Sequence, residues 1–132
     1  MARRKHNGMN WIRQEKRLAI HLRDGLSCGY CGAGLEDGIT FTLDHVIPVK
    51  HGGGNQATNL ITCCLTCNSS KQERSLVEFA AAVANYRNHG VTADDIIEHV
   101  AVCTARPLPM AEAKAMKERR GSCAKAIEAL RG

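Results

Sequence analysis

The chain has 132 residues, of which 23% are charged, with a formal net charge of +5 and seven cysteines. This length suits a single domain over residues 1–132, because the buried fraction of a protein's surface becomes adequate only above roughly 100 residues. The sequence argues against a membrane or secreted protein, since it has no run of about 18 apolar residues and its N-terminus lacks an apolar signal stretch. We therefore expect a soluble, cytoplasmic protein, in which a reducing environment favours metal binding over disulfides as the use of the cysteines.

The excess positive charge is concentrated at the N-terminus. Residues 1–17 hold six basic side chains against one acidic side chain, whereas residues 18–132 hold twelve of each. Such a cluster is either a solvated tail or a basic arm that contacts phosphates, since lysine and arginine clusters provide sequence-independent affinity for nucleic acids. As an arm, it would contact phosphate through Arg3, Arg4 and Lys5.

Apolar periodicity and turn residues predict a mixed α+β chain. Residues 10–25 have helical periodicity, with Asn10 as the candidate N-cap and Gly25 as the stop. A glycine-rich turn with two cysteines follows, and the β-branched and aromatic residues of 39–48 predict a strand that is closed by a proline. Residues 59–71 predict a short second strand that bends into a helix.

Three helical segments are predicted after residue 75. The first runs from an N-cap at Ser75 to about Gly90. The second has Thr92 and Asp95 at capping-box spacing and ends before a proline. The third occupies the C-terminal residues and is broken or weakened at Gly121.

Four cysteines have the spacing of a structural zinc site. Two Cys-x-x-Cys turns can each offer two thiolates to one tetrahedral ion. They comprise Cys28, Cys31, Cys64 and Cys67. Redox pairs or buried thiols are the alternative, although two such turns in one chain rarely serve redox chemistry. Cys63 is a rival ligand with a wider spacing to the last cysteine, whereas Cys103 and Cys123 lie on apolar helix faces and are expected to pack in the core.

The segment between the cysteine turns carries a second pattern. "DHVIP", "GGGN", "NL", "CLTCN" and then Lys71 follow one another in an order that resembles the HNH endonuclease family. The resemblance covers about residues 20–74. It implies an α+β fold with a ββα-metal core and a structural zinc ion. The periodicity described above adds an N-terminal helix before this core and a helical extension over residues 75–132, which lies outside the resemblance.

The resemblance also implies roles for individual residues. His45 would be the general base that deprotonates the attacking water. Asp44 and Asn68 would hold a Mg²⁺-like ion, or another divalent ion such as Mn²⁺, through oxygen ligands. Asn59 would brace the loop and orient His45, because its amide has both donor and acceptor groups.

Further residues are candidates for substrate contact. Lys71 follows Asn68 by three residues on a helix and would contact a phosphate near the ion. His51 would contact substrate or metal, or would be a solvated loop residue. The glycines at 52–54 would allow left-handed turns and a close approach of the backbone to nucleic acid.

The expected substrate is double-stranded DNA, cut with low sequence specificity because no recognition helix is evident. The few aromatic residues argue against a base-stacking platform for single strands. The alternatives are an RNA-directed nuclease and a catalytically inactive, zinc-held module that binds nucleic acid. A monomer would nick one strand, whereas a double-strand break would require a homodimer or a larger nucleic-acid-processing assembly. Small members of the family occur in bacteria and phages, which implies a bacterial cytoplasm.

Overall fold

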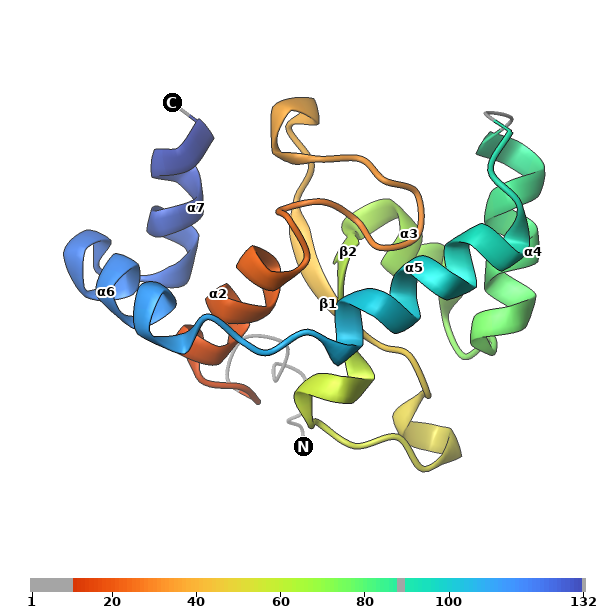
Figure 1. The fold of residues 1–132 in the computed structure, drawn as a ribbon, viewed down its shortest axis with the longest axis horizontal. Helices are drawn as coiled ribbons and strands as arrows, with labels where there is room; N and C mark the ends of the chain where they lie inside the picture. The colour runs from red at the N-terminus through yellow and green to blue at the C-terminus, as the bar shows by residue number, and fades with distance from the viewer. Residues whose placement is uncertain (1–10, 88–89, 132) are drawn as a thin grey trace.

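Two antiparallel strands lie at the centre of the structure, a computed structural model that describes residues 11–87 and 90–131 (Figure 1). β1 (Phe41–His45) pairs with β2 (Leu60–Cys64), and α3 (Leu65–Lys71) follows β2 directly. Every residue of β2 is buried, since helices cover the strand from both sides. The two strands and α3 form the expected ββα unit, which confirms the α+β fold class.

The helix predicted over 10–25 is α2 (Gln14–Arg23), which begins later than expected. Arg13 precedes it in an extended conformation, and the candidate cap Asn10 lies outside the described residues. The predicted stop is confirmed, because Gly25 adopts a left-handed conformation with φ of 74°. Helix α2 packs against β2 and so covers one side of the strand pair.

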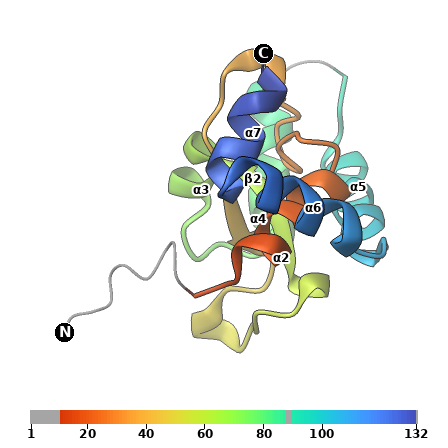
Figure 2. The ribbon, with the colours of Figure 1, turned by 90° about the vertical axis from the view of Figure 1, so that its left-hand side faces the viewer.

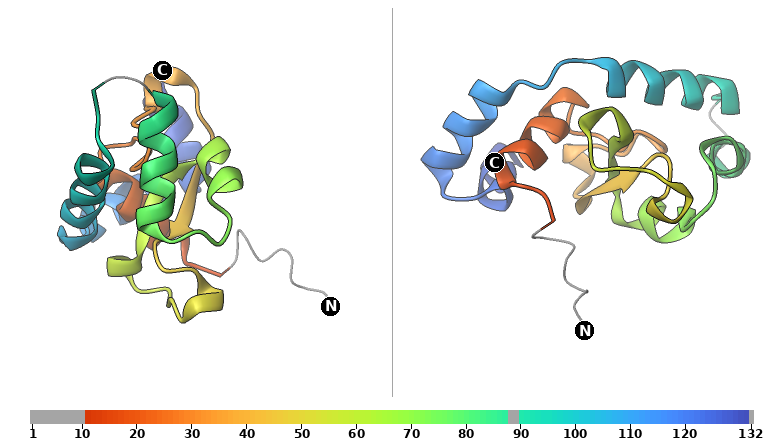
Figure 3. Two further views of the ribbon diagram at one scale, coloured as in Figure 1. Left: turned by 90° about the vertical axis from the view of Figure 1, so that its right-hand side faces the viewer. Right: turned by 90° about the horizontal axis from the view of Figure 1, so that it is seen from below.

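The remaining helices lie at opposite ends of the molecule (Figure 1). α4 (Leu76–Arg87) and α5 (Ala93–Ala105) lie side by side at one end, as Figure 3 shows on the left. α6 (Met110–Arg120) and α7 (Cys123–Arg131) pack against α2 at the other end, which Figure 2 shows in front. None of the helices in the described part of the chain is long and apolar enough to cross a bilayer.

Local signals set the ends of these helices as predicted. The backbone N–H of Glu78 donates to Ser75 Oγ at 3.1 Å, and the Ser75 N–H donates back to the Glu78 carboxylate at 3.0 Å. Thr92 and Asp95 form the same reciprocal pair, with both distances 3.0 Å. Gly121 separates α6 from α7 at φ of 100°.

A buried ion pair fastens α2 to β2. Arg23 Nε lies 2.7 Å from Asp24 Oδ1, and both side chains are fully buried. The Asp24 carboxylate accepts the Thr62 N–H at 2.8 Å, and the Arg23 guanidinium donates to the carbonyls of Leu60 and Ala57 at 2.6 and 2.9 Å. Because these charges are paired and hydrogen-bonded, their burial is tolerated, and they fix the start of β2 and the loop before it.

Candidate functional site

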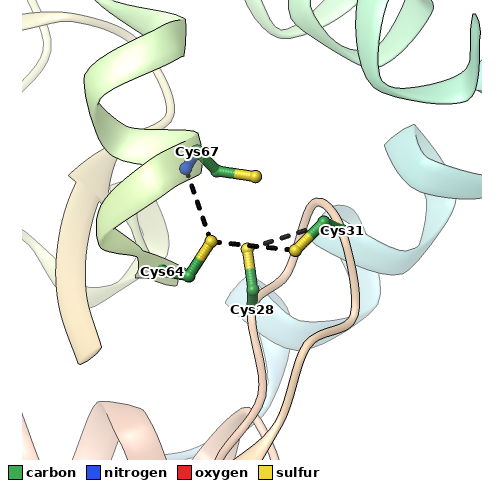
Figure 4. Close-up of side chains that lie close together, drawn as sticks. All are labelled: Cys28, Cys31, Cys64 and Cys67. Atoms are coloured by element: carbon green, nitrogen blue, oxygen red, sulfur yellow. Dashed lines mark hydrogen bonds between the residues drawn. The ribbon is translucent and has the colours of Figure 1, made fainter. Parts of the chain in front are cut away.

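The four paired cysteines meet beside the start of α3. Their sulfur atoms lie within 4.8 Å of one another, and the Sγ atoms of Cys31 and Cys64 are 3.7 Å apart (Figure 4). In each turn the second cysteine's N–H donates to the first cysteine's sulfur, at 3.5 Å for Cys31 to Cys28 and 3.4 Å for Cys67 to Cys64. Four thiolates bound to zinc at about 2.3 Å are separated by similar distances. The predicted set of four is therefore positioned to hold a metal ion.

The charge of this cluster also fits a cation. Hydrogen bonding from Cys31 and other neighbouring thiols holds the pKa of Cys28 well below its usual range. Hydrogen bonding to Cys28 raises the pKa of Cys31 to about 11 and raises that of Cys67 as well. One thiolate thus suppresses ionisation of its neighbours, because adjacent negative charges repel. A divalent cation removes this conflict, and four sulfur donors match zinc.

The other cysteines lie outside this set. Cys64 is the N-cap of α3, and its sulfur accepts a hydrogen bond from the first turn of that helix. Cys64 therefore belongs to the set of four, and the alternative ligand Cys63 does not. Cys63 is fully buried in the core. Cys103 and Cys123 are also buried among apolar side chains, and their predicted packing role is confirmed.

Asp44 is held by two donors that meet at the same oxygen. Its side chain is buried, with a relative exposure of 6% for the residue. Tyr30 donates its hydroxyl to Oδ2 at 2.6 Å, and Lys71 Nζ lies 3.2 Å from that same atom. Burial raises the pKa of Asp44, and the bonds from Tyr30 and Lys71 oppose this rise. Since both donors use Oδ2, the other carboxylate oxygen can serve a cation.

Asn68, on α3, is oriented in a similar way. Its Nδ2 donates to Thr42 Oγ1 at 2.8 Å and to the Leu43 carbonyl at 3.3 Å. The Thr42 hydroxyl in turn donates to the Cys63 carbonyl at 2.7 Å, which fixes its own orientation. With the amide nitrogen held by β1, the amide oxygen of Asn68 is the atom that can face a cation.

His45 lies at the end of β1 and lines a cavity of about 280 Å³ together with Asp44 and Asn68. Its Nε2 lies 2.7 Å from Asn55 Oδ1, and its ring centroid lies 5.0 Å from that of Trp11. The structure therefore brings together the three residues to which the sequence assigned base and ion-binding roles. Asn55 and Trp11 are contacts of His45 that the sequence analysis did not identify, although Asn55 is the last residue of the "GGGN" pattern.

Asn59 braces the loop between the strands. Its buried amide accepts the Ile47 N–H at 2.8 Å and donates to the carbonyls of Ile47 and Gly54 at 3.1 and 3.0 Å. The side chain that contacts the His45 ring is Asn55, so Asn59 acts on the loop backbone and not on the imidazole itself.

The structure places Lys71 differently from the expected phosphate contact. Its side chain is fully buried, and Nζ donates to the carbonyls of His45 and Val46 at 3.1 and 3.4 Å in addition to its ion pair with Asp44. The reason is that α3 packs against the sheet, so its last turn faces the end of β1 and not the solvent. Lys71 thus holds the Asp44 carboxylate and the backbone at the end of β1 in place from the protein interior.

The other expected substrate contacts fall elsewhere. His51 is exposed on a short 3-10 helix, Val49–His51, and lines a separate hollow beside the start of α4. Arg3, Arg4 and Lys5 lie outside the described residues.

Only one of the three loop glycines has a left-handed backbone, in contrast to the expectation for the whole run. Gly52 has φ of 96°. Gly53 is required for a different reason, because a Cβ atom there would collide with the carbonyl oxygen of Ile47. The loop is therefore folded back on itself tightly at Gly53.

Comparison with known proteins supports this description of the segment. The family model described as HNH endonuclease matches residues 28–74. No curated protein and no solved structure matches the chain. The matched residues begin at the first cysteine of the metal set and include both strands, the loop between them and α3. The match confirms, over residues 28–74, the resemblance to this family that was drawn from the sequence.

Proposed function

We propose that the protein is a metal-dependent endonuclease that hydrolyses phosphodiester bonds in DNA. The observation that carries this proposal is the cavity shared by Asp44, His45 and Asn68. Hydrogen bonds hold one polar atom of each side chain and leave the second polar atom, an oxygen or a ring nitrogen, to bind an ion or accept a proton. The family match supports a nuclease-type function in general. The residue roles and the substrate are our inference.

The donor set suits a hard divalent ion such as Mg²⁺ or Mn²⁺. Asp44 and Asn68 each present an oxygen, and two protein ligands leave several coordination positions for water and phosphate oxygens. Such an ion, when bound, would stabilise the negative charge that develops on the phosphate and the leaving oxygen. The Lys71 ammonium and the Tyr30 hydroxyl keep the Asp44 carboxylate in place for this role.

His45 is the general base of the proposed reaction. Its imidazole takes a proton from a water molecule, and the water oxygen attacks phosphorus in line with the leaving 3′ oxygen. The bond between phosphorus and the 3′ oxygen then breaks, and the 3′ oxygen is protonated from solvent. The products carry a 5′-phosphate and a 3′-hydroxyl.

A binding module without activity is the main competitor, and the charge of the site argues against it. A carboxylate such as Asp44, buried at the wall of a cavity that receives phosphate, repels that phosphate unless a cation lies between them. A site that only bound nucleic acid would gain from losing this residue. The same chemistry could act on RNA, so the substrate must be tested directly.

The test is cleavage of supercoiled plasmid with Mg²⁺, with Mn²⁺ and with EDTA, alongside a matched double-stranded RNA. Asp44→Asn serves as the inactive variant, because it keeps the size of the side chain but removes its charge. We expect open-circular DNA with Mg²⁺ or Mn²⁺, none with EDTA and far less with Asp44→Asn, while the zinc content stays constant. DNA binding without cleavage under every metal condition would support the inactive module, and preferential cleavage of the RNA would reassign the substrate.

A further inference from the structure

We propose that Asn55 is a positioning residue that fixes the tautomer of His45, so that the ring proton sits on Nε2 and Nδ1 is the basic nitrogen. The consequence for catalysis rests on the proposed function, whereas the tautomer itself does not. This role is distinct from that of Asn59, which holds the loop backbone.

The argument begins from the contact between the two side chains. Asn55 Oδ1 lies 2.7 Å from His45 Nε2, at the short end of the range for such a hydrogen bond. An amide oxygen can only accept, so Nε2 must carry the proton, and a neutral imidazole then has its lone pair on Nδ1. With the amide reversed, Nδ2 would donate to Nε2, the ring proton would move to Nδ1, and neither nitrogen could accept a proton from water. Only the first arrangement leaves a base.

Asn55 is itself anchored from a distant part of the chain. Lys16, on α2, donates from Nζ to the Asn55 carbonyl oxygen at 2.9 Å. On the other side, Asn59 Nδ2 binds the preceding carbonyl, that of Gly54. Two side chains from different elements therefore fix the backbone that presents the Asn55 amide to the ring.

The imidazole is also held from its face and from its own backbone. Trp11 lies against the ring, with an angle of 31° between the planes, and the guanidinium of Arg17 lies 5.8 Å from the Trp11 ring centroid. The His45 carbonyl accepts from Lys71 Nζ. With its face, its backbone and Nε2 engaged, the ring has few orientations available, which is the condition for an effective general base.

Two variants separate this role from a general effect on the loop. Asn55→Leu removes the acceptor at nearly constant size, whereas Asn55→Asp keeps an acceptor oxygen at the same place. Gln56→Leu is the matched control, because Gln56 is the next residue in the loop and is also exposed. Each variant is compared with the wild type by plasmid nicking kinetics and by long-range ¹H–¹⁵N spectra of the imidazoles at a pH where they are neutral, with His45→Ala used to assign the His45 signals.

In the wild-type spectrum we expect the His45 proton on Nε2. Asn55→Leu should mix the two tautomers and lower kcat roughly tenfold or more, with KM within about twofold. Asn55→Asp should restore the single tautomer and most of kcat, and Gln56→Leu should match the wild type. A proton on Nδ1 in the wild type, or an Asn55→Leu variant with unchanged tautomer and unchanged kcat, would overturn the proposal. If the wild type cleaves no nucleic acid, the proposed function fails, and the tautomer spectra still decide the role of Asn55.

Discussion

At the scale of single residues, Asp44 and His45 have different neighbours although both line the same cavity, because successive strand side chains point to opposite faces and this pair lies at the end of β1, where the strand meets the loop. Asp44 contacts Tyr30 and the end of α3, whereas His45 contacts Trp11 and Asn55. Tyr30 lies inside the first Cys-x-x-Cys turn. The turn that is positioned to bind zinc therefore also delivers a hydroxyl to the proposed ligand of the catalytic ion.

Replacement of His45 by alanine tests the general base. Nicking should fall by at least about a hundredfold, the usual scale of general base catalysis, because the imidazole that takes the proton from water is removed. Zinc content, melting temperature and DNA affinity should stay close to wild type. His99→Ala is the control, since His99 is exposed on α5 and does not line the cavity. Nicking by His45→Ala at near the wild-type rate would show that the base lies elsewhere.

Replacement of Tyr30 by phenylalanine tests the support of Asp44. The aromatic packing against Phe79 is preserved, but the hydroxyl that binds Oδ2 is lost. We expect Mn²⁺ binding, measured by electron paramagnetic resonance, to weaken about 10- to 100-fold, as is typical when a partner of a metal ligand is removed. Zinc content should not change. Tyr86→Phe is the matched control, because its hydroxyl lies near Cys67 and not near Asp44; equal Mn²⁺ affinities in both variants would remove Tyr30 from this role.

At the scale of elements, the loop between β1 and β2 determines where His45 and Asn55 meet. Asn59 ties both sides of this loop together through Ile47 and Gly54. The close approach of Gly53 to the Ile47 carbonyl completes the fold of the loop. The run of glycines is thus explained mainly by the loop's internal packing.

Replacement of Gly53 by alanine should open this loop. The new Cβ would collide with the backbone of Ile47 and approach the Asn59 amide, neither of which can move without breaking the hydrogen bonds that hold the loop. We expect a loss of about 1–3 kcal/mol in the free energy of unfolding, measured by urea denaturation, together with reduced nicking. In Gly54→Ala the obstacle is only the flexible end of Gln56, so that variant should remain near wild type. Similar losses in the two variants would contradict the explanation.

At the scale of the whole molecule, the cysteine cluster joins the turn at residues 28–31 to the start of α3, and the largest core packs around it. That core includes three of the four cysteines as fully or nearly fully buried residues, together with side chains of α4 and α5. The helices after residue 75 therefore contribute to the hydrophobic cores. α4 and α5 pack against the cysteine cluster, and α6 and α7 pack against α2.

Replacement of Cys67 by serine tests the structural metal. Zinc coordination contributes folding free energy on the order of 10 kcal/mol in small zinc domains, so the loss of one thiolate should lower the zinc content and cause melting or aggregation near room temperature. Cys123→Ser changes another buried cysteine outside the cluster and should retain zinc. Elemental analysis and thermal melts provide the measurement. Full zinc content and stability in Cys67→Ser would exclude this cysteine as a ligand.

The basic arm is tested by the salt dependence of DNA affinity. Replacing Arg3, Arg4 and Lys5 by alanine should weaken binding and reduce the log–log salt slope by about 0.9 for each phosphate contact that is lost, without changing the melting temperature. The control removes the same charge from the C-terminal helices by replacing Arg119, Arg120 and Lys125. An arm variant with the wild-type slope, or a control with the same reduction, would exclude a specific phosphate contact by the arm.

The sequence alone determined the features that depend on neighbouring residues. β-branched and aromatic residues, capping residues and the glycine at 121 act within a few residues, so the order of two strands and a helix, and the helix ends after residue 75, could be predicted. The spacing within each Cys-x-x-Cys turn also identified the metal set, because that spacing is a local property of the ligand turn.

Only the tertiary structure decided which polar atoms meet. The contact of Tyr30 with Asp44, the burial of Lys71 and the pairing of His45 with Asn55 depend on how the strands, loop and helices pack against one another. Lys71 follows Asn68 by three residues, and this sequence spacing is the same whether that face of the helix contacts solvent or the sheet. The direction of that face is set by the packing of α3 on the strand pair, a long-range contact with no local signature, and so the internal support of the site became visible only in the fold.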